Sequence, residues 1–213
     1  MTLPHGNETA LPGPFAEDDV RYSEGLMRFF IERLSEPSDA VLDPFAGFGT
    51  TLLVAESLGR EAFGVELDPD RAAYIRSHVR APDRLFTADA RQLVDLPIPP
   101  VRLAITSPPY SSPGDPEEAL SAYRDPNPGY DRYLADLQQV CRSVGSLLTP
   151  DGWLVIEAAN LRRPDRVDTL AWDIARAVGE VLPFAGEIVV RWEPTYGYGY
   201  DHSYCLLFSP PAG

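Results

Sequence analysis

The stretch Asp-Pro-Phe-Ala-Gly-Phe-Gly-Thr-Thr at 43–51 has the residue types and spacing of a loop that holds a small ligand. The apolar residues 41–42 before it read as a buried strand, which the proline ends because it donates no N–H. Gly47 and Gly49 allow a tight turn close to a ligand, and helical sequence follows from Thr50. A strand, glycine turn and helix present backbone N–H groups and a positive helix end to that ligand. An ordinary turn with two glycines is the alternative, since short glycine motifs often match by chance.

A second stretch, Ser-Pro-Pro-Tyr at 107–110, follows another apolar strand at 101–105. Its two prolines stiffen the turn and contribute carbonyl oxygens without competing N–H groups. A serine hydroxyl, a fixed carbonyl and a tyrosine ring suit the capture of a flat amine, whose hydrogens need acceptors. Ligands of open α/β sheets bind beyond the carboxyl ends of the strands. We therefore expect this turn and the 43–51 loop to lie face to face.

Together the two stretches resemble the motifs of the S-adenosylmethionine-dependent amino-methyltransferases of the DNA N4-cytosine/N6-adenine family. The resemblance implies a class I methyltransferase fold and S-adenosylmethionine as the cofactor. The loop residues that it assigns to cofactor binding are Asp43, Pro44, Phe45, Ala46, Gly47, Gly49, Thr50 and Thr51. The catalytic residues that it assigns are Ser107, Pro108, Pro109 and Tyr110, with Ser107 also beside the cofactor.

Two acidic residues follow further strands of the same pattern. Glu66, with Leu67 after it, ends the second strand of a βαβ unit, where an acid can accept both hydroxyl groups of a ribose. An exposed acid at a strand end is the alternative. The resemblance places Asp89, with Ala90 beside it, at the adenine amino group of the cofactor. Capping of the following helix explains Asp89 equally well.

The exocyclic nitrogen of a nucleic-acid base shares its lone pair with the ring, so it must become pyramidal before it attacks a methyl sulfonium. The Ser107 hydroxyl and the Pro108 carbonyl are the predicted acceptors for its two hydrogens, and Tyr110 is the predicted stacking ring. Asp or Asn is commoner than Ser107 in the adenine and guanine enzymes of the family, so the serine favours cytosine N4 in DNA. Open alternatives are an RNA base amine (guanine N2 or cytosine N4), a protein glutamine amide, or a cofactor-binding subunit that needs a partner.

Alternating strands and helices position these motifs. Besides the strand before the 43–51 loop, strands are predicted at 61–66, 84–87, 101–105 and 153–157, and helices at 23–35, 69–79, 130–148 and 167–182. Strands 187–192 and 203–208 form a closing antiparallel hairpin. The pattern predicts an α/β three-layer sandwich, and with the resemblance a Rossmann-like class I methyltransferase fold whose seven-stranded sheet is mostly parallel. An irregular N-terminal arm is expected at 1–20 and a single methyltransferase domain at 21–213.

Three segments are candidates for contact with a substrate. The proline-rich stretch 111–129 reads as a lid or substrate loop, or else as a solvated connector. Arg162 and Arg163 belong to the densest basic cluster, which either binds a phosphate or forms a solvated loop. Tyr196 and Tyr198 alternate with glycines and either stack on a base or form a rigid aromatic corner.

Composition limits the partners that the chain can bind. The 213 residues carry a net charge of −14, and all 18 basic residues are arginine. An acidic chain gains little non-specific affinity for a polyanion. Either a local basic face exists, or a protein partner or homodimer supplies target recognition, or the substrate is not nucleic acid. The motifs favour nucleic acid, DNA in preference to RNA. No apolar run reaches the roughly 20 residues of a membrane span, and no signal pattern opens the chain, which predicts a cytoplasmic protein.

Cys141 and Cys205 lack the context of a nucleophile, a disulfide framework or a metal site.

Overall fold

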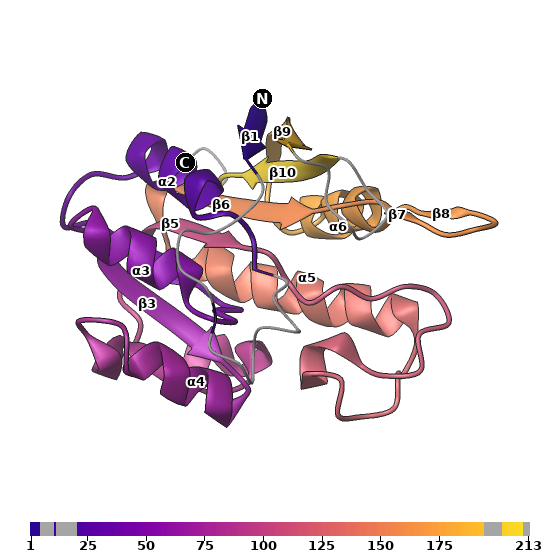
Figure 1. Ribbon diagram of the computed structural model, residues 1–213, viewed down its shortest axis with the longest axis horizontal. Coiled ribbons are helices and arrows are strands. Elements are labelled where there is room, and N and C mark those ends of the chain that lie inside the picture. Colours follow the sequence, from indigo (N-terminus) through magenta and orange to yellow (C-terminus); the bar gives the residue numbers. More distant parts are fainter. Residues whose placement is uncertain (5–10, 12–20, 194–201, 211–213) are drawn as a thin grey trace.

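The computed structural model describes residues 1–4, 11, 21–193 and 202–210. An eight-stranded sheet runs through them in the order β1-β9-β10-β6-β5-β2-β3-β4 (Figure 1). The strands are β1 (Thr2–Pro4), β2 (Ala40–Asp43), β3 (Glu61–Glu66), β4 (Leu85–Thr87), β5 (Val101–Thr106), β6 (Leu148–Ala158), β9 (Phe184–Glu193) and β10 (His202–Phe208). The section from β6 to β4 is parallel throughout, whereas β10 pairs antiparallel with both β6 and β9. The predicted mostly parallel sheet with an antiparallel hairpin is confirmed.

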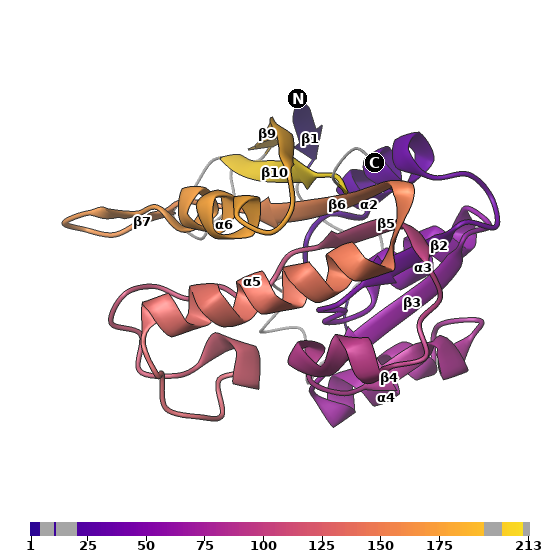
Figure 2. The same ribbon diagram turned by 180° about the vertical axis from the view of Figure 1, so that it is seen from behind.

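Helices cover both faces of this sheet, as Figures 1 and 2 show from opposite sides. On one face lie α2 (Glu24–Leu34), α3 (Thr50–Ser57) and α4 (Pro69–Arg76), which contribute to one buried apolar cluster. On the other face lie α5 (Tyr130–Leu147), α6 (Leu170–Gly179) and the 3-10 helix η2 (Ala90–Asp95), which contribute to a second cluster. Successive residues of a strand face opposite sides, so Val41 joins the first cluster and Leu42 the second. The predicted three-layer sandwich is confirmed.

The sheet has one strand more than the seven predicted. Thr2–Pro4, expected to be part of an irregular arm, forms β1 and pairs in parallel with Arg191, Trp192 and Glu193 of β9. The added strand occupies backbone groups at the edge of β9 that would otherwise lack partners. The sequence did not predict β1 because three residues that include a proline are too few to show an alternating pattern. The proline is tolerated because β1 is an edge strand.

Two helix predictions were wrong at their ends. The helix predicted at 167–182 spans only Leu170–Gly179, because β8 (Val167–Asp168) pairs with β7 (Leu161–Arg162) in a small hairpin. The helix predicted at 69–79 stops at Arg76, and a 3-10 turn, η1 (Pro82–Arg84), precedes β4. In both cases the apolar periodicity of the sequence continues beyond the residues that form the hydrogen-bonded turns of the helix.

The two cysteines belong to the hydrophobic core. Cys141 on α5 and Cys205 on β10 are buried free thiols. Burial raises the pKa of the Cys141 thiol to about 12 and that of Cys205 well above its ordinary value, so neither is ionised near neutral pH. The described residues also contain no helix with the length and apolarity to cross a bilayer.

Candidate active site

One cavity of about 450 Å³ opens at the carboxyl ends of β2, β3, β5 and β6. Both predicted motifs line it, so the structure brings the glycine loop and the Ser-Pro-Pro-Tyr turn together. The predicted site residues in its wall are Pro44, Phe45, Ala46, Gly47, Thr50, Glu66, Leu67, Ala90, Ser107, Pro108, Pro109, Tyr110, Arg162 and Arg163. Ligands of open α/β sheets bind at this edge, which identifies the cavity as the candidate active site.

Asp43 lies behind the glycine loop rather than in the cavity wall. Its fully buried carboxylate accepts hydrogen bonds from the hydroxyl groups of Tyr22, Thr51 and Thr106 and from the N–H of Phe45. Burial raises the pKa of Asp43, and these hydrogen bonds oppose that rise because they stabilise the charged form. Asp43 and Thr51 therefore do not line the cavity but fix the loop, and their part in cofactor binding stays a prediction.

The Asp43 network also connects the two motifs. Thr106, the residue before Ser107, donates to one carboxylate oxygen at 2.7 Å, and Phe45 of the loop donates to the same oxygen at 3.0 Å. Gly49 likewise lies outside the cavity wall, where it precedes α3 with a φ of 81°. A Cβ at this position would lie 2.9 Å from the Ile75 side chain, so Gly49 serves close packing and a left-handed turn.

Glu66 at the end of β3 is buried beside the glycine loop. One carboxylate oxygen accepts the N–H of Gly47 at 2.8 Å, and the other accepts the N–H of Asp68 at 2.8 Å. Burial raises the pKa of Glu66, and these two backbone donors oppose the rise. The carboxylate lines the cavity, so the alternative of an exposed strand-end acid is wrong. Its bond to ribose stays a prediction.

Asp89 caps the 3-10 helix η2, which is one of the two roles that the sequence predicted for it. Its side chain accepts the N–H of Arg91 at 2.8 Å and also binds the Arg91 guanidinium through both oxygens. Ala88 and Ala90 line the cavity, whereas Asp89 does not. Its role at the adenine amino group stays a prediction.

Glu157 is a buried cavity residue that the sequence did not single out. It ends the apolar part of β6, lies in the cavity wall and is 5% exposed. Its carboxylate accepts a hydrogen bond from the Tyr110 hydroxyl group at 3.2 Å, and the hydroxyl groups of Ser107 and Ser203 help to stabilise its charged form. Burial is the main reason that the pKa of Glu157 is raised. The sequence pattern that could have identified Glu157 is an acidic residue directly after an apolar strand, which is the pattern that identified Glu66.

Further cavity residues were not among the predicted site residues. They include Tyr22 before α2, Phe48 in the glycine loop, Arg71 on α4, Tyr123 in the 111–129 segment and Trp192 on β9. Part of the 111–129 segment, residues 119, 120, 122 and 123, therefore forms cavity wall, as a lid or substrate loop requires.

The two candidate phosphate-binding arginines have different surroundings. Arg163 donates to Asp168 at 3.1 Å and to the Ser112 hydroxyl at 2.8 Å, so it holds the β7–β8 hairpin against the segment after the catalytic turn. Arg162 is exposed, and its guanidinium has no hydrogen-bond or ion-pair partner within the part of the chain that the structure describes. Tyr196 and Tyr198 lie outside the described residues.

Comparison with known proteins points to methyltransferases. A family model described as DNA methylase matches residues 16–77. The chain is 40% identical over 51 residues to the type II methyltransferase M.BglII of Bacillus subtilis and 43% identical over 54 residues to M.PvuII of Proteus hauseri. These matches cover 24% and 25% of this chain but only 14% and 16% of the relatives.

Solved structures show the fold over most of the chain. TrmN from Thermus thermophilus superimposes with a TM-score of 0.62 at 22% identity, over 88% of this chain and 48% of that protein. A TehB-like SAM-dependent methyltransferase from Corynebacterium glutamicum gives a TM-score of 0.60 at 15% identity, over 92% of both chains. The chain therefore has the Rossmann-like methyltransferase fold.

Proposed function

We propose that this chain is an S-adenosylmethionine-dependent methyltransferase that methylates an exocyclic amino group of a nucleic-acid base, cytosine N4 in DNA. The observation that carries the proposal is the single cavity that the glycine loop and the Ser-Pro-Pro-Tyr turn share. The match of residues 16–77 to a DNA methylase model supports DNA. The serine at 107 favours cytosine over adenine.

The cavity residues fit the cofactor. The glycine loop and Glu66 meet at the Gly47 N–H, and a buried carboxylate with raised pKa suits hydroxyl donors. Phe45, Val65, Leu67 and Ala90 supply apolar wall for an adenine ring. Bound there, S-adenosylmethionine supplies a methyl group on a sulfonium, which an amine can attack directly.

The chain's own residues then prepare the amine. Ser107 donates its only hydroxyl hydrogen to Glu157, so the lone pairs of its oxygen stay free to accept an N–H of the substrate. The Pro108 carbonyl accepts the other N–H. When the methyl–sulfur bond breaks and the C–N bond forms, the nitrogen would become cationic and lose a proton to the Ser107 oxygen, while the hydroxyl proton of Ser107 would pass to Glu157. The raised pKa of Glu157 makes it a stronger proton acceptor than an exposed glutamate.

Glu157→Gln is expected to lower kcat by about 10²- to 10⁴-fold, the range of a general-base contribution, and to remove the rise of kcat with pH. In the wild type only ionised Glu157 accepts the proton, so kcat rises with pH through its raised pKa and then levels. Tyr22 and Cys205, two of the titratable groups that interact with Glu157, have raised pKa values and stay neutral over that range. The measurement is kcat against pH at saturating cofactor.

Stability provides the control for this variant. Because the folded state binds the Glu157 proton more tightly than the unfolded state does, ionisation reduces stability as pH rises from the ordinary glutamate pKa to the raised one. Glu157→Gln should therefore unfold at a temperature no lower than the wild type at neutral pH. A wild-type pH profile in Glu157→Gln would contradict the proton transfer. Glu66→Gln should instead weaken cofactor binding.

Arg162→Ala is expected to weaken nucleic-acid binding and to reduce the slope of log K against log salt by about 1, because one phosphate contact is lost. Its guanidinium is exposed at the cavity and lacks a partner among the described residues. The measurement is a fluorescence-anisotropy titration with labelled DNA at several salt concentrations. Arg28→Ala on α2, an equally exposed arginine paired with Glu32, is the matched control. An unchanged slope would assign the phosphate contact elsewhere.

Transfer of tritium from labelled S-adenosylmethionine tests the proposed function. Label in unmethylated DNA, recovered after hydrolysis as N4-methylcytosine, is the expected result, and N6-methyladenine would overturn the choice of base. Label in RNA alone would favour the RNA alternative. Given the net charge of −14, a protein partner or homodimer that supplies target recognition is also part of the proposal, and adding a host extract should then raise the rate.

A further inference from the structure

The segment after the catalytic turn contains a compact closed loop, residues 117–126, which we call the strap. A bridge between Glu117 and Pro126 closes it. The N–H of Glu118 donates to the Asp125 carbonyl at 2.8 Å, and the Ser121 hydroxyl accepts the N–H groups of Arg124 and Asp125. The strap thus has a fixed shape of its own, and four of its residues line the cavity.

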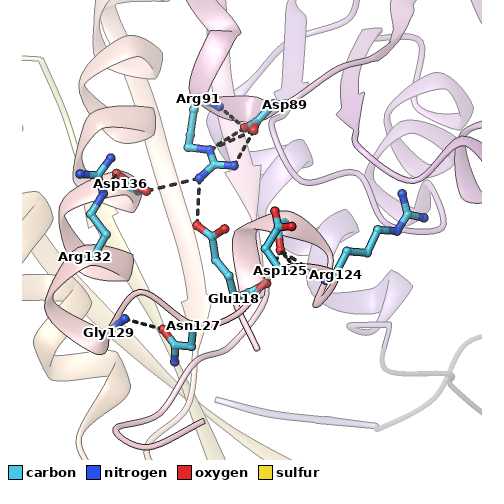
Figure 3. A network of polar contacts seen from close by, with 10 residues as sticks. Asp89, Arg91, Glu118, Arg124, Asp125, Asn127, Gly129, Arg132 and Asp136 are labelled. Carbon is cyan, nitrogen blue, oxygen red and sulfur yellow. Dashed lines mark hydrogen bonds and ion pairs between the residues drawn. The ribbon is translucent and has the colours of Figure 1, made fainter. Parts of the chain in front are cut away.

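The base of the strap is anchored through Arg91, as Figure 3 shows. The Arg91 guanidinium binds Glu118 at 2.9 Å, Asp136 of α5 at 3.4 Å and Asp89 at 2.7 Å. Glu118 and Asp136 are both buried. Removing one partner from such a group leaves an uncompensated buried charge. The base is therefore held firmly to the body of the protein.

The tip of the strap contacts both halves of the active site. The Tyr123 hydroxyl donates to the carbonyl of Tyr110 in the catalytic turn at 3.0 Å. The next residue, Arg124, forms an ion pair with Asp68, whose N–H donates to Glu66. Ala122 and Tyr123 adopt left-handed backbone angles, with φ of 56° and 60°. Such angles are unfavourable for residues other than glycine and concentrate at functional sites.

A second tyrosine acts on the same turn from α5. The hydroxyl of the buried Tyr133 donates to the carbonyl of Pro109 at 3.0 Å. The carbonyls of Pro109 and Tyr110 thus each have a donor, whereas no donor among the described residues reaches the carbonyl of Pro108. Pro108 is the carbonyl that the proposed function assigns to the substrate amine.

We propose that Tyr123 and Arg124 are positioning residues, which set the catalytic turn relative to the ribose-binding end of the cavity. The inference rests on the proposed function. The path runs from Glu66 through Asp68 and Arg124 to Tyr123, and from there to the Tyr110 carbonyl. Cofactor held at Glu66 strengthens these contacts, and with them the position of the Pro108 carbonyl and the Ser107 hydroxyl relative to the amine.

Tyr123→Phe removes only the hydroxyl group. It should lower kcat on unmethylated plasmid DNA by about 2- to 13-fold, the effect of one lost hydrogen bond, with unchanged KM for DNA and unchanged cofactor affinity. Tyr130→Phe is the matched control, because the Tyr130 hydroxyl donates to Asp173 on α6 and not to the turn. Equal kcat in Tyr123→Phe and wild type would overturn the positioning role.

Arg124 is tested by rescue and by hydrogen exchange. Arg124→Ala should lower kcat as Tyr123→Phe does, Arg124→Lys should restore most of it, and Arg28→Ala, which removes an exposed arginine on α2 paired with Glu32, should not change it. Adding S-adenosylmethionine should slow amide exchange in residues 117–126 of the wild type by about 5-fold or more, the effect of a hydrogen bond of roughly 1 kcal/mol, but not in Arg124→Ala. Cofactor binding without slower exchange in the wild type would overturn the coupling alone. Absence of cofactor binding by calorimetry would overturn the proposed function and the coupling with it.

Discussion

Ser107→Ala is expected to lower kcat by about 100- to 1,000-fold, the loss typical of removing one group that stabilises a transition state. The hydroxyl group does two things in the proposed reaction: it accepts an N–H of the substrate and passes its own hydrogen to Glu157. Alanine can do neither, and the amine keeps its planar geometry. The measurement is single-turnover methyl transfer at saturating cofactor and DNA.

Cofactor affinity separates this effect from a general loss of structure. Ser107→Ala should bind S-adenosylmethionine within about 3-fold of the wild type, because the side chain contributes at most one modest hydrogen bond to that site. Ser143→Ala is the matched control, since the Ser143 hydroxyl donates only to the Gln139 carbonyl within α5. Normal turnover in Ser107→Ala would disprove the acceptor role.

Gly47→Val is expected to have the opposite signature, with cofactor affinity lowered by about 10- to 100-fold, which corresponds to roughly 1.4 to 2.8 kcal/mol. Gly47 has a φ of 57°, and a left-handed backbone costs a residue with a Cβ about 1–2 kcal/mol. A valine would relax that strain by turning the loop, which would withdraw the Gly47 N–H from Glu66. Calorimetric titration with S-adenosylmethionine measures the change.

Gly114→Val controls for backbone strain alone. Gly114 also has a left-handed φ, 91°, and a Cβ there would meet nothing within 4 Å. Its position lies outside the cavity wall. This variant should lose similar stability in thermal unfolding and keep its cofactor affinity. Equal loss of affinity in both variants would mean that Gly47 acts through stability and not through the loop.

The sequence was sufficient for the parts of the site that depend on short, local patterns. The glycine loop and the Ser-Pro-Pro-Tyr turn each follow an apolar strand, and neighbouring parallel strands end at one edge, so their meeting in one cavity was predictable. Glu66 was found by the same rule. β1 was missed because three residues form no periodic pattern, and its pairing with β9 joins segments at opposite ends of the chain.

The rest of the site depends on contacts between residues far apart in the sequence. Asp43 was assigned to the cofactor because it belongs to the motif, but three hydroxyl groups from separate elements hold its side chain behind the loop. Arg124 and Asp68 are 56 positions apart. Their ion pair exists only because the strap folds back over the end of β3, and no local pattern in either segment predicts it.

The carboxylate of Asp43 has a consequence for how such a protein can change over generations. Tyr22, Thr51 and Thr106 all donate to it, and the three belong to different segments of the chain. Replacing Asp43 would remove the acceptor that the three hydroxyl groups share, and replacing any one of the three donors would remove a hydrogen bond that stabilises its buried charge, which is costly. Selection should therefore act on the four as a unit: across related genes they should vary together, while the wall of the pocket in front of them diversifies one residue at a time.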